Sequence, residues 1–419
     1  MNSLVNKCTH ASALIFICLI VILPSGSIGS INVKVLSMTF LLLSLIMSLI
    51  LKKHIRMKTL KLVSITCFAM VLILFEYYSS SSLATQKGYR DIESFLFFTY
   101  FVSTLVIIVL ILEEFISKHF LLGVIFYASL LYSGIKLVAT VCAALGFISM
   151  ASISDFVLLS FGVQPMLFPI TEYFSRLQLA NDYIICFCLF FTIVRPDLFS
   201  FTSKKFFVIG MLLLFICVII SFSRFMLLLL LCSLILKLIR IKSISVSGFI
   251  AFVFFILLVT SLYYVNFEQV NNAIELRFSS SGVNQHSDAT RDFQVTCLSK
   301  SIDKSPFLGV GGFGDYSVLC PGPINAEFSY EVQYLGFIYR FGFIPTLLFM
   351  LIYFFQFSMS IEGWLFSKYN IPSFIAMLTW MMVGFFNPYL ISAFASVIVA
   401  LCMSCSGGYK LIKKPFDLS

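Results

Sequence analysis

The stretch "CVIISFSRFMLLLL", residues 217–230, places one arginine between two purely apolar runs. Arg224 is the only charged side chain in the 31 positions from Phe206 to Leu236. A charge near the middle of a bilayer costs about 2.5–3.5 kcal/mol on insertion scales, so it normally has a function or lies near an interface. Because 31 residues are too many for one membrane span and few for two, the stretch predicts a tight helical hairpin whose turn is "SFSR".

The composition is that of a membrane protein. The chain has 419 residues, of which 60% are hydrophobic and 11% charged, and it contains 49 phenylalanines. Repeated runs of about 20 apolar residues, each long enough to cross the hydrocarbon core, predict an all-α polytopic membrane protein. The net charge of +9 comes from basic residues in short loops, which orient helices, so we do not read it as a nucleic-acid signal. The first apolar run, Ala11 to Leu23, resembles a signal peptide, but it lacks a small-residue cleavage site and is read as a retained helix.

The hydropathy pattern predicts about twelve spans and three regions. The regions are a membrane bundle of nine helices at 1–266, an outer loop at 267–331 and a bundle of three further helices at 332–419. The predicted spans are 11–29, 33–51, 60–78, 94–112, 120–147, 183–194, 206–221, 224–241, 246–265, 332–357, 372–386 and 389–405.

Loop charges set the predicted orientation. The strongest basic cluster, "KKHIRMK" at 52–58, is expected on the cytoplasmic side. Counting alternate spans from there puts both termini in the cytoplasm and the turn at Arg224 on the outer face. The same count puts the basic segments 195–205, 237–242 and 409–414 inside, and 79–92, 148–182 and 267–331 outside.

Two outer segments are too polar for ordinary spans. Segment 148–182, broken by two prolines, is expected to lie along the interface or to re-enter; its Arg176 is either a solvated loop residue or part of a site. In the loop 267–331, "RFSSSGVNQHSDATR" has the composition of a flexible segment, whereas the following stretch predicts a short amphipathic helix that ends in "PFLGVGGFG". The apolar positions of that helix are Phe293, Cys297, Leu298 and Ile302.

The glycines and cysteines of this loop carry separate predictions. A nucleotide-binding loop is a weak reading of the glycines, because no strand precedes them and no helix-opening Lys-Ser/Thr follows. If the loop faces an oxidising compartment, a disulfide between Cys297 and Cys320 is plausible. Most other cysteines lie in apolar spans, where they act as small hydrophobes, so we expect no metal and no cofactor.

The outer face offers arginines and carboxylates in place of a hydrolase constellation. Neither HExxH, GxSxG nor DxD occurs, and of the four histidines only His286 is predicted outside. Guanidinium forks match phosphate oxygens and stay charged, whereas a carboxylate can deprotonate a sugar hydroxyl. Such a set suits glycosyl transfer from a lipid-pyrophosphate donor without a metal. The predicted outer charges are Arg176, Arg224, Arg277, Arg291, Arg340, Asp288, Asp292, Glu327 and Glu331.

Three patches together resemble the O-antigen polymerase and O-antigen ligase superfamily of bacterial inner-membrane proteins. They are "SFSRFMLLLL", "TRDFQVTCLSKSIDKSPFLGVGGFG" and "EVQYLGFIYRFGFIPTLLF". The resemblance implies a GT-C-like helical fold with about twelve transmembrane helices and one large periplasmic loop. It also implies an undecaprenyl-pyrophosphate-linked oligosaccharide as substrate and, as a possible partner, a chain-length regulator protein.

The resemblance assigns roles to individual residues. Arg224 and Arg291 match arginines that the family is thought to use for the lipid pyrophosphate, and the third patch matches at Tyr334, Leu335 and Gly342. The ligase-type histidine is replaced by Glu331, and the usual acidic position is Arg340. This departure favours a polymerase of lipid-linked repeat units. The resemblance therefore implies Glu331 and Arg291 as catalytic, and Arg224, Arg291, Arg176 and Arg340 as pyrophosphate-binding.

Three alternatives stay open at this point. Glu331 is either a general base or merely the ion-pair partner of Arg340 or of another arginine; an i,i+9 spacing on one helix is too long for a pair with Arg340. The chain is alternatively an O-antigen ligase with His286 as base. A lipid-linked oligosaccharide flippase or transporter is a third reading, disfavoured because no two-fold repeat is evident and the charges gather outside the membrane.

Overall fold

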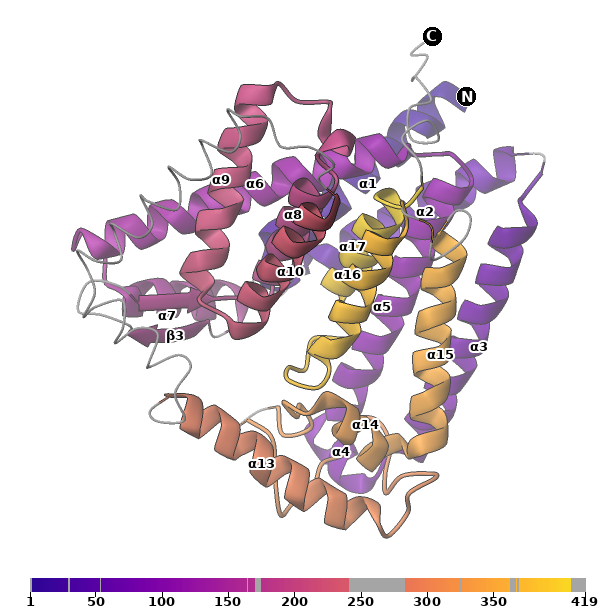
Figure 1. The fold of residues 1–419 in the computed structure, drawn as a ribbon. Coiled ribbons are helices and arrows are strands. Elements are labelled where there is room, and N and C mark those ends of the chain that lie inside the picture. The colour runs from indigo at the N-terminus through magenta and orange to yellow at the C-terminus, as the bar shows by residue number, and fades with distance from the viewer. Residues whose placement is uncertain are drawn as a thin grey trace.

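The computed structural model describes residues 2–28, 31–52, 54–163, 165–169, 175–240, 283–323, 326–361, 367 and 369–407. This part of the chain is mostly helical (Figure 1). The helices are α1 (Asn2–Ile22), α2 (Val33–Leu51), α3 (Met57–Ser79), α4 (Ser82–Lys87), α5 (Tyr89–Leu112), α6 (Lys118–Ala144), α7 (Met150–Phe161), α8 (Asp182–Val194), α9 (Lys204–Ser221), α10 (Arg224–Arg240), α13 (Val283–Ile302), α14 (Gln333–Phe341), α15 (Phe343–Ser360), α16 (Ile371–Val383) and α17 (Ala393–Ser404).

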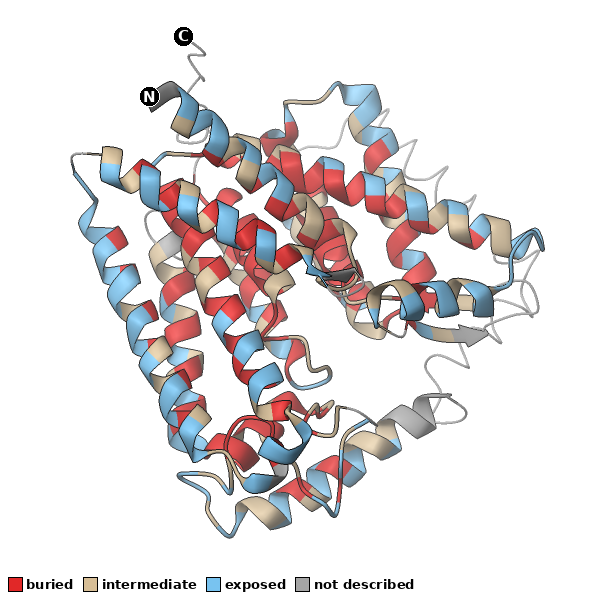
Figure 2. Ribbon diagram, turned by 180° about the vertical axis from the view of Figure 1, so that it is seen from behind, coloured by how far each residue is buried: buried red, intermediate tan, exposed pale blue. Residues whose placement is uncertain are grey.

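Several helices have the length and composition of membrane spans. Among the described residues, α1, α2, α3, α5, α6 and α9 are long and apolar enough to cross a bilayer, and α7, α8, α15, α16 and α17 are shorter apolar helices. The peripheral helix α3 exposes large apolar side chains such as Phe75, at 62%, whereas the central helices α8 and α17 are buried almost completely (Figure 2). A helix that is apolar on its exposed face as well as its buried face is suited to lipid. The predicted span 246–265 lies outside the described residues.

The hairpin expected around Arg224 is present. Helix α9 ends at Ser221 and α10 begins at Arg224, so only two residues form the turn. One of them, Phe222, adopts a left-handed backbone conformation with φ of 43°, which reverses the chain sharply. Both helices pack against α8 more than against each other.

The predicted span 332–357 is wrong as a single helix, because the chain breaks at Gly342 into α14 and α15. Gly342 has φ of 82°, and a Cβ atom there would collide with the carbonyl of Phe307. The glycine-containing loop docks at this break: the Phe343 amide donates to the Pro306 carbonyl at 2.8 Å, and the Val310 amide to the Tyr339 carbonyl at 2.9 Å. Glycine is required because two backbones meet here without room for a side chain.

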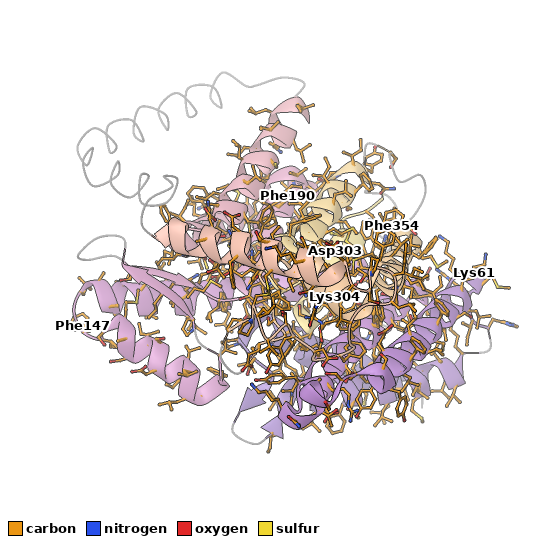
Figure 3. All side chains as sticks on the ribbon, turned by 90° about the horizontal axis from the view of Figure 1, so that it is seen from below. Lys61, Phe147, Phe190, Asp303, Lys304 and Phe354 are labelled. Carbon is orange, nitrogen blue, oxygen red and sulfur yellow. A yellow bond between two sulfur atoms is a disulfide. The ribbon has the colours of Figure 1, made fainter. Side chains whose placement is uncertain are left out.

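The amphipathic helix predicted in the outer loop is α13, and it is longer than expected. It starts at Val283, so the part of the "flexible" segment from 283 onward is helical. The disulfide between Cys297 and Cys320 is formed. Leu298 is fully buried beside it in a small second core, whereas Phe293 is 56% exposed and faces away. Helix α13 crosses one end of the bundle, and Asp303 and Lys304 follow its last turn (Figure 3).

Segment 148–182 forms α7 and a short hairpin in place of a span. Strands β3 (Met166–Pro169) and β4 (Ser175–Gln178) pair antiparallel, with Phe168 opposite Arg176. A second ribbon pairs β1 (Ser27–Ile28) with β2 (Ile31–Asn32), two residues each, between α1 and α2. Apart from these two small ribbons, the regular structure of the described residues is helical, which agrees with the expected all-α class. The apolar side chains before and on α7 are strongly exposed: Phe147 by 77% and Leu159 by 86%.

The helices place the predicted loops at opposite ends of the bundle. The connections from α2 to α3 and from α8 to α9, which carries the 3-10 turn Pro196–Phe199, lie at one end. Helices α4, α13 and α14 gather at the other end (Figure 1). The described residues of the basic segments 52–58 and 195–205 therefore lie at the opposite end of the bundle from α13.

Candidate functional site

Arg224 lies at the start of α10 and forms a two-pronged ion pair with α13. Its Nη2 donates to Oδ1 of Asp288 at 2.9 Å and its Nη1 to Oδ2 at 3.3 Å. The two side chains are 36% and 45% exposed, so the pair is open to solvent. The N-terminus of α10 also lies here, and its helix dipole favours an anion at this position.

Arg291 continues the chain of charges one turn further along α13. Its Nη1 lies 2.9 Å from Oδ1 of Asp288, and its Nε lies 2.9 Å from Oε2 of Glu331. Arg224, Asp288, Arg291 and Glu331 thus form one continuous row of alternating charges. The row joins three elements: the hairpin turn, the surface helix and the chain entering α14.

Glu331 is held in place by its own backbone and its neighbours. Its amide donates to Oε1 of Gln294, a buried residue of α13, at 3.0 Å. Two residues later, Oε1 of Gln333 accepts from the amide of Leu390 at 3.0 Å. Glu331 is therefore fixed between α13 and the loop that joins α16 to α17. Of the partners considered from sequence, the structure pairs Glu331 with Arg291.

Arg176 approaches the same place from β4. Its Nε donates to the carbonyl of Ser221 at 3.0 Å, and its guanidinium also donates to the side chain of Gln178. Burial lowers the pKa of Arg176, and the neighbouring charge of Arg224 lowers it further. Because Ser221 ends α9 and Arg224 begins α10, the two arginines lie at the same hairpin turn. The structure thus brings together four of the five predicted residues: Arg176, Arg224, Arg291 and Glu331.

A buried polar network lies behind the hairpin turn. Lys136 Nζ is 2.7 Å from Oδ2 of Asp182 and 2.7 Å from Oγ of Ser221, and the Tyr132 hydroxyl donates to Asp182 at 2.9 Å. Ser221 therefore accepts a hydrogen bond from Lys136 through its hydroxyl and one from Arg176 through its carbonyl. These two bonds fix the residue before the turn. Sequence reasoning missed this network, although Lys136 is the only charge in the predicted span 120–147.

Tyr389 is a further aromatic group at the edge of the arginines. Burial raises the pKa of its hydroxyl, the Glu331 carboxylate raises it further, and Arg176 lowers it. The ring of Tyr389 packs against Tyr183 of α8 at 5.7 Å between centroids. Sequence analysis did not single out Tyr389, because it begins the predicted span 389–405, where an aromatic side chain is ordinary.

Arg340 differs from the other predicted residues, and its assignment to pyrophosphate is corrected. Its Nη2 lies 2.8 Å from Oε1 of Glu93, and both side chains are almost fully buried, at 3% and 4% exposure. Its Nη1 donates to the carbonyl of Phe328 at 2.5 Å. These contacts keep the guanidinium in the protein interior, where its ion pair with Glu93 links α14 to α5.

The glycine-rich loop is also structural. The carboxylate of Asp315 accepts from the amides of Ser81, at 2.9 Å, and Gly312, at 2.8 Å. The amide of Gly314 donates to Glu93 at 2.7 Å. Loop amides that bind protein carboxylates are not presented to a phosphate, which agrees with the weak nucleotide-binding reading.

The open cluster therefore has the chemistry of an anion site with an adjacent carboxylate. Three arginines face two carboxylates, Asp288 and Glu331, which leaves an excess of positive charge. Guanidinium groups suit a diphosphate, and a carboxylate suits acceptance of a hydroxyl proton. Among the described residues no group of three or more His, Cys, Asp or Glu side chains is placed to hold a metal ion.

Comparison with known proteins shows that part of the chain matches a family model. No curated protein matches the chain. The family model of the O-antigen ligase matches residues 209–351, a range that includes Arg224, Asp288, Arg291 and Glu331. The match covers about a third of the chain and supports O-antigen polymerase or ligase activity in general. It confirms that the chain resembles the O-antigen polymerase and ligase superfamily.

Proposed function

We propose that this protein is a polymerase that joins oligosaccharide repeat units carried on undecaprenyl pyrophosphate. The observation that carries the proposal is the row Arg224–Asp288–Arg291–Glu331, which combines phosphate-binding groups with a carboxylate. We place the reaction at the periplasmic face of the bacterial inner membrane, with both termini cytoplasmic. The placement rests on the basic loops 52–58 and 195–205 at the opposite end of the bundle.

The proposed reaction is a displacement at the anomeric carbon of the growing chain. A hydroxyl oxygen of the incoming repeat unit forms the new bond to that carbon, and the bond from the carbon to the pyrophosphate oxygen breaks. Undecaprenyl pyrophosphate leaves with the bonding electrons, and the hydroxyl proton passes to Glu331. Arg224, Arg291 and Arg176 stabilise the negative charge that develops on the leaving diphosphate.

Glu331 favours a polymerase over a ligase within this superfamily. It stands where the ligase-type sequences have a histidine, and it directly contacts Arg291. A carboxylate next to the arginine that holds the leaving group supplies both a proton acceptor and an orienting partner. We therefore propose Glu331 as the general base and Arg291 as catalytic, with a chain-length regulator as a possible partner protein.

The test uses purified full-length protein in liposomes, supplied with the lipid-linked repeat unit and no other acceptor. A ladder of lengthening glycans on a gel is expected. Arg224→Ala, Arg291→Ala and Glu331→Gln should each lower the initial rate by about 10²–10³, the usual cost of removing one transition-state contact. Arg56→Ala, which removes the same charge from an exposed pair with Glu114, is the matched control and should keep the wild-type rate.

Two results would point elsewhere. Product that forms only when lipid A core is added, with no ladder from repeat units alone, would identify a ligase. Movement of the lipid-linked unit across the liposome membrane without new glycosidic bonds would identify a transporter.

A further inference from the structure

Asp288 accepts hydrogen bonds from Arg224 and Arg291, the same donors that the proposed function assigns to the diphosphate. Both prongs of the Arg224 guanidinium donate to it, and Nη1 of Arg291 lies on the same Oδ1 oxygen. A carboxylate presents two oxygens to a guanidinium fork as a phosphate does, and the same N–H group cannot make its full bond to both. A diphosphate that binds these donors therefore has to displace Asp288.

We propose that Asp288 is a competing carboxylate built into the pyrophosphate site. It holds Arg224 and Arg291 while the site is empty, leaves them when the lipid pyrophosphate binds, and returns as that product departs. This inference rests on the proposed function and deepens it, because it gives the site a way to release a tightly bound anion.

The surroundings show why Asp288, and not the arginines, is the member that exchanges. Arg291 keeps Glu331 as a second partner, and Arg224 is anchored in the hairpin turn. Asp288 is 45% exposed, whereas the other half of α13 is fixed by the Cys297–Cys320 disulfide and by fully buried Leu298. Water can therefore solvate the displaced carboxylate at little cost, since the group is already half in solvent.

The competition also sets a preference for ligands. A diphosphate offers more oxygens than a single carboxylate and can contact both arginines at once, so it displaces Asp288 effectively. A monophosphate gains less from the same exchange. Asp288 thus lowers affinity for every anion, but it costs the diphosphate the smallest share of its binding free energy.

The experiment measures inorganic pyrophosphate binding to the purified full-length protein in detergent by titration calorimetry. Asp288→Asn keeps the shape and removes the charge, and it should lower the dissociation constant by about two- to fivefold, the upper range of exposed ion pairs. Asp292→Asn is the matched control, since it removes the same charge from an exposed position of the same helix and should change binding less than about twofold. Arg224→Ala should abolish binding.

A purely structural role for Asp288 gives the opposite sign. If the Arg224–Asp288 pair only positions the arginines, Asp288→Asn loosens them and pyrophosphate binds more weakly; that result, or no change, overturns the inference while Arg224 dependence keeps the proposed function. Pyrophosphate binding that survives Arg224→Ala, or is absent in both wild type and Asp288→Asn, overturns the pyrophosphate site itself and the proposed function with it. Thermal melting of each variant confirms that it is folded.

Discussion

Arg340 and Arg224 each pair with one carboxylate, but they do so in opposite surroundings. The Arg340–Glu93 pair is 3% and 4% exposed, whereas the Arg224–Asp288 pair is 36% and 45% exposed. The rings of Tyr330, Phe337 and Phe341 surround the Arg340 guanidinium at 5.5–5.8 Å. The same residue type therefore serves as a fixed internal tie in one place and as an accessible cation in the other.

The difference teaches that solvent access, and not charge, separates an arginine fixed in a buried pair from one that an external anion can reach. A buried pair loses the hydration of both partners and is kept only if every group is matched. An exposed pair contributes little to stability and can be exchanged for another partner at small cost. Four predictions test this division, beginning with the largest expected effect.

Breaking the buried Arg340–Glu93 pair should destabilise the end of the bundle that α4, α13 and α14 form. Arg340→Ala leaves the Glu93 charge buried without its partner, so we expect a loss of about 3–5 kcal/mol. The measurement is the thermal unfolding midpoint in detergent, and Arg224→Ala is the control that should melt close to wild type. Replacing both partners, in Glu93→Gln with Arg340→Met, should recover much of the loss because no lone charge remains. Equal destabilisation by Arg224→Ala and Arg340→Ala would contradict the division.

The glycine-rich loop should be essential to the stability of the buried region around Arg340 and Glu93. Gly309 has φ of 75°, and a Cβ atom there would collide with the carbonyl of Arg340. Gly309→Ala is therefore expected to cost about 1–3 kcal/mol, the usual range for a strained backbone position. Gly134→Ala in α6, where a Cβ meets no atom within 4 Å, should be neutral or slightly stabilising. Urea or thermal unfolding of the two variants side by side provides the comparison; a Gly309 variant as stable as the Gly134 variant would show that the loop is not tightly docked.

At Arg224, the planar shape of the guanidinium should matter more than its positive charge. Arg224→Lys keeps the positive charge but loses the planar fork that meets two oxygens. We expect about a tenfold lower initial rate of glycan elongation, with a thermal midpoint close to wild type. Polymerisation assays at several donor concentrations separate binding from turnover. A lysine variant with the wild-type rate would mean that Arg224 acts only as a diffuse charge.

The smallest effect is expected at the partly exposed pair of Glu327 with Lys87 of α4. Hydrogen bonds from Lys87 and Tyr89 lower the pKa of Glu327 to about 2. A depressed carboxyl pKa stabilises the fold above the unfolded-state value of about 4.3, and this contribution is lost as pH falls toward 2. Glu327→Gln should therefore lower the thermal midpoint slightly at pH 6 and leave less of a difference from wild type near pH 3. A difference that is larger at pH 3 than at pH 6 would refute the depressed pKa.

The residues that the structure brings together in the exposed row carry local sequence patterns, whereas the buried Arg340–Glu93 pair does not, for one physical reason. Arg224, Arg291 and Glu331 lie in local patterns (a lone charge between apolar runs, a surface helix, a polar residue before a span) whose meaning depends on nearby residues. Arg340 depends on Glu93, far earlier in the chain, and no local pattern reveals that partner. The break at Gly342 is hidden in the same way, because hydropathy continues across it while the loop that docks there is distant.

Two other features had signals that sequence reasoning did not use. Asp288 precedes Arg291 by three residues, a spacing that puts both on one face of a helix. A predicted helix that included Asp288 would therefore have predicted this ion pair. Lys136 was as isolated among apolar residues as Arg224, and the structure gives it a buried partner in Asp182. A lone charge in a span thus marks either an interface or a buried pair, and only the fold distinguishes them.

The separation of Arg224 and Asp288 by 64 positions has a consequence for how the protein is made. During translation the hairpin of α9 and α10 is complete before Asp288 has been synthesised, so its arginine enters the membrane without its carboxylate. Its first partners are water and lipid phosphate at the interface, which long cationic side chains reach by extending along the bilayer surface. We therefore expect the newly made hairpin to contact lipid headgroups first, and to join the row of Asp288, Arg291 and Glu331 only when α13 arrives to replace the headgroup.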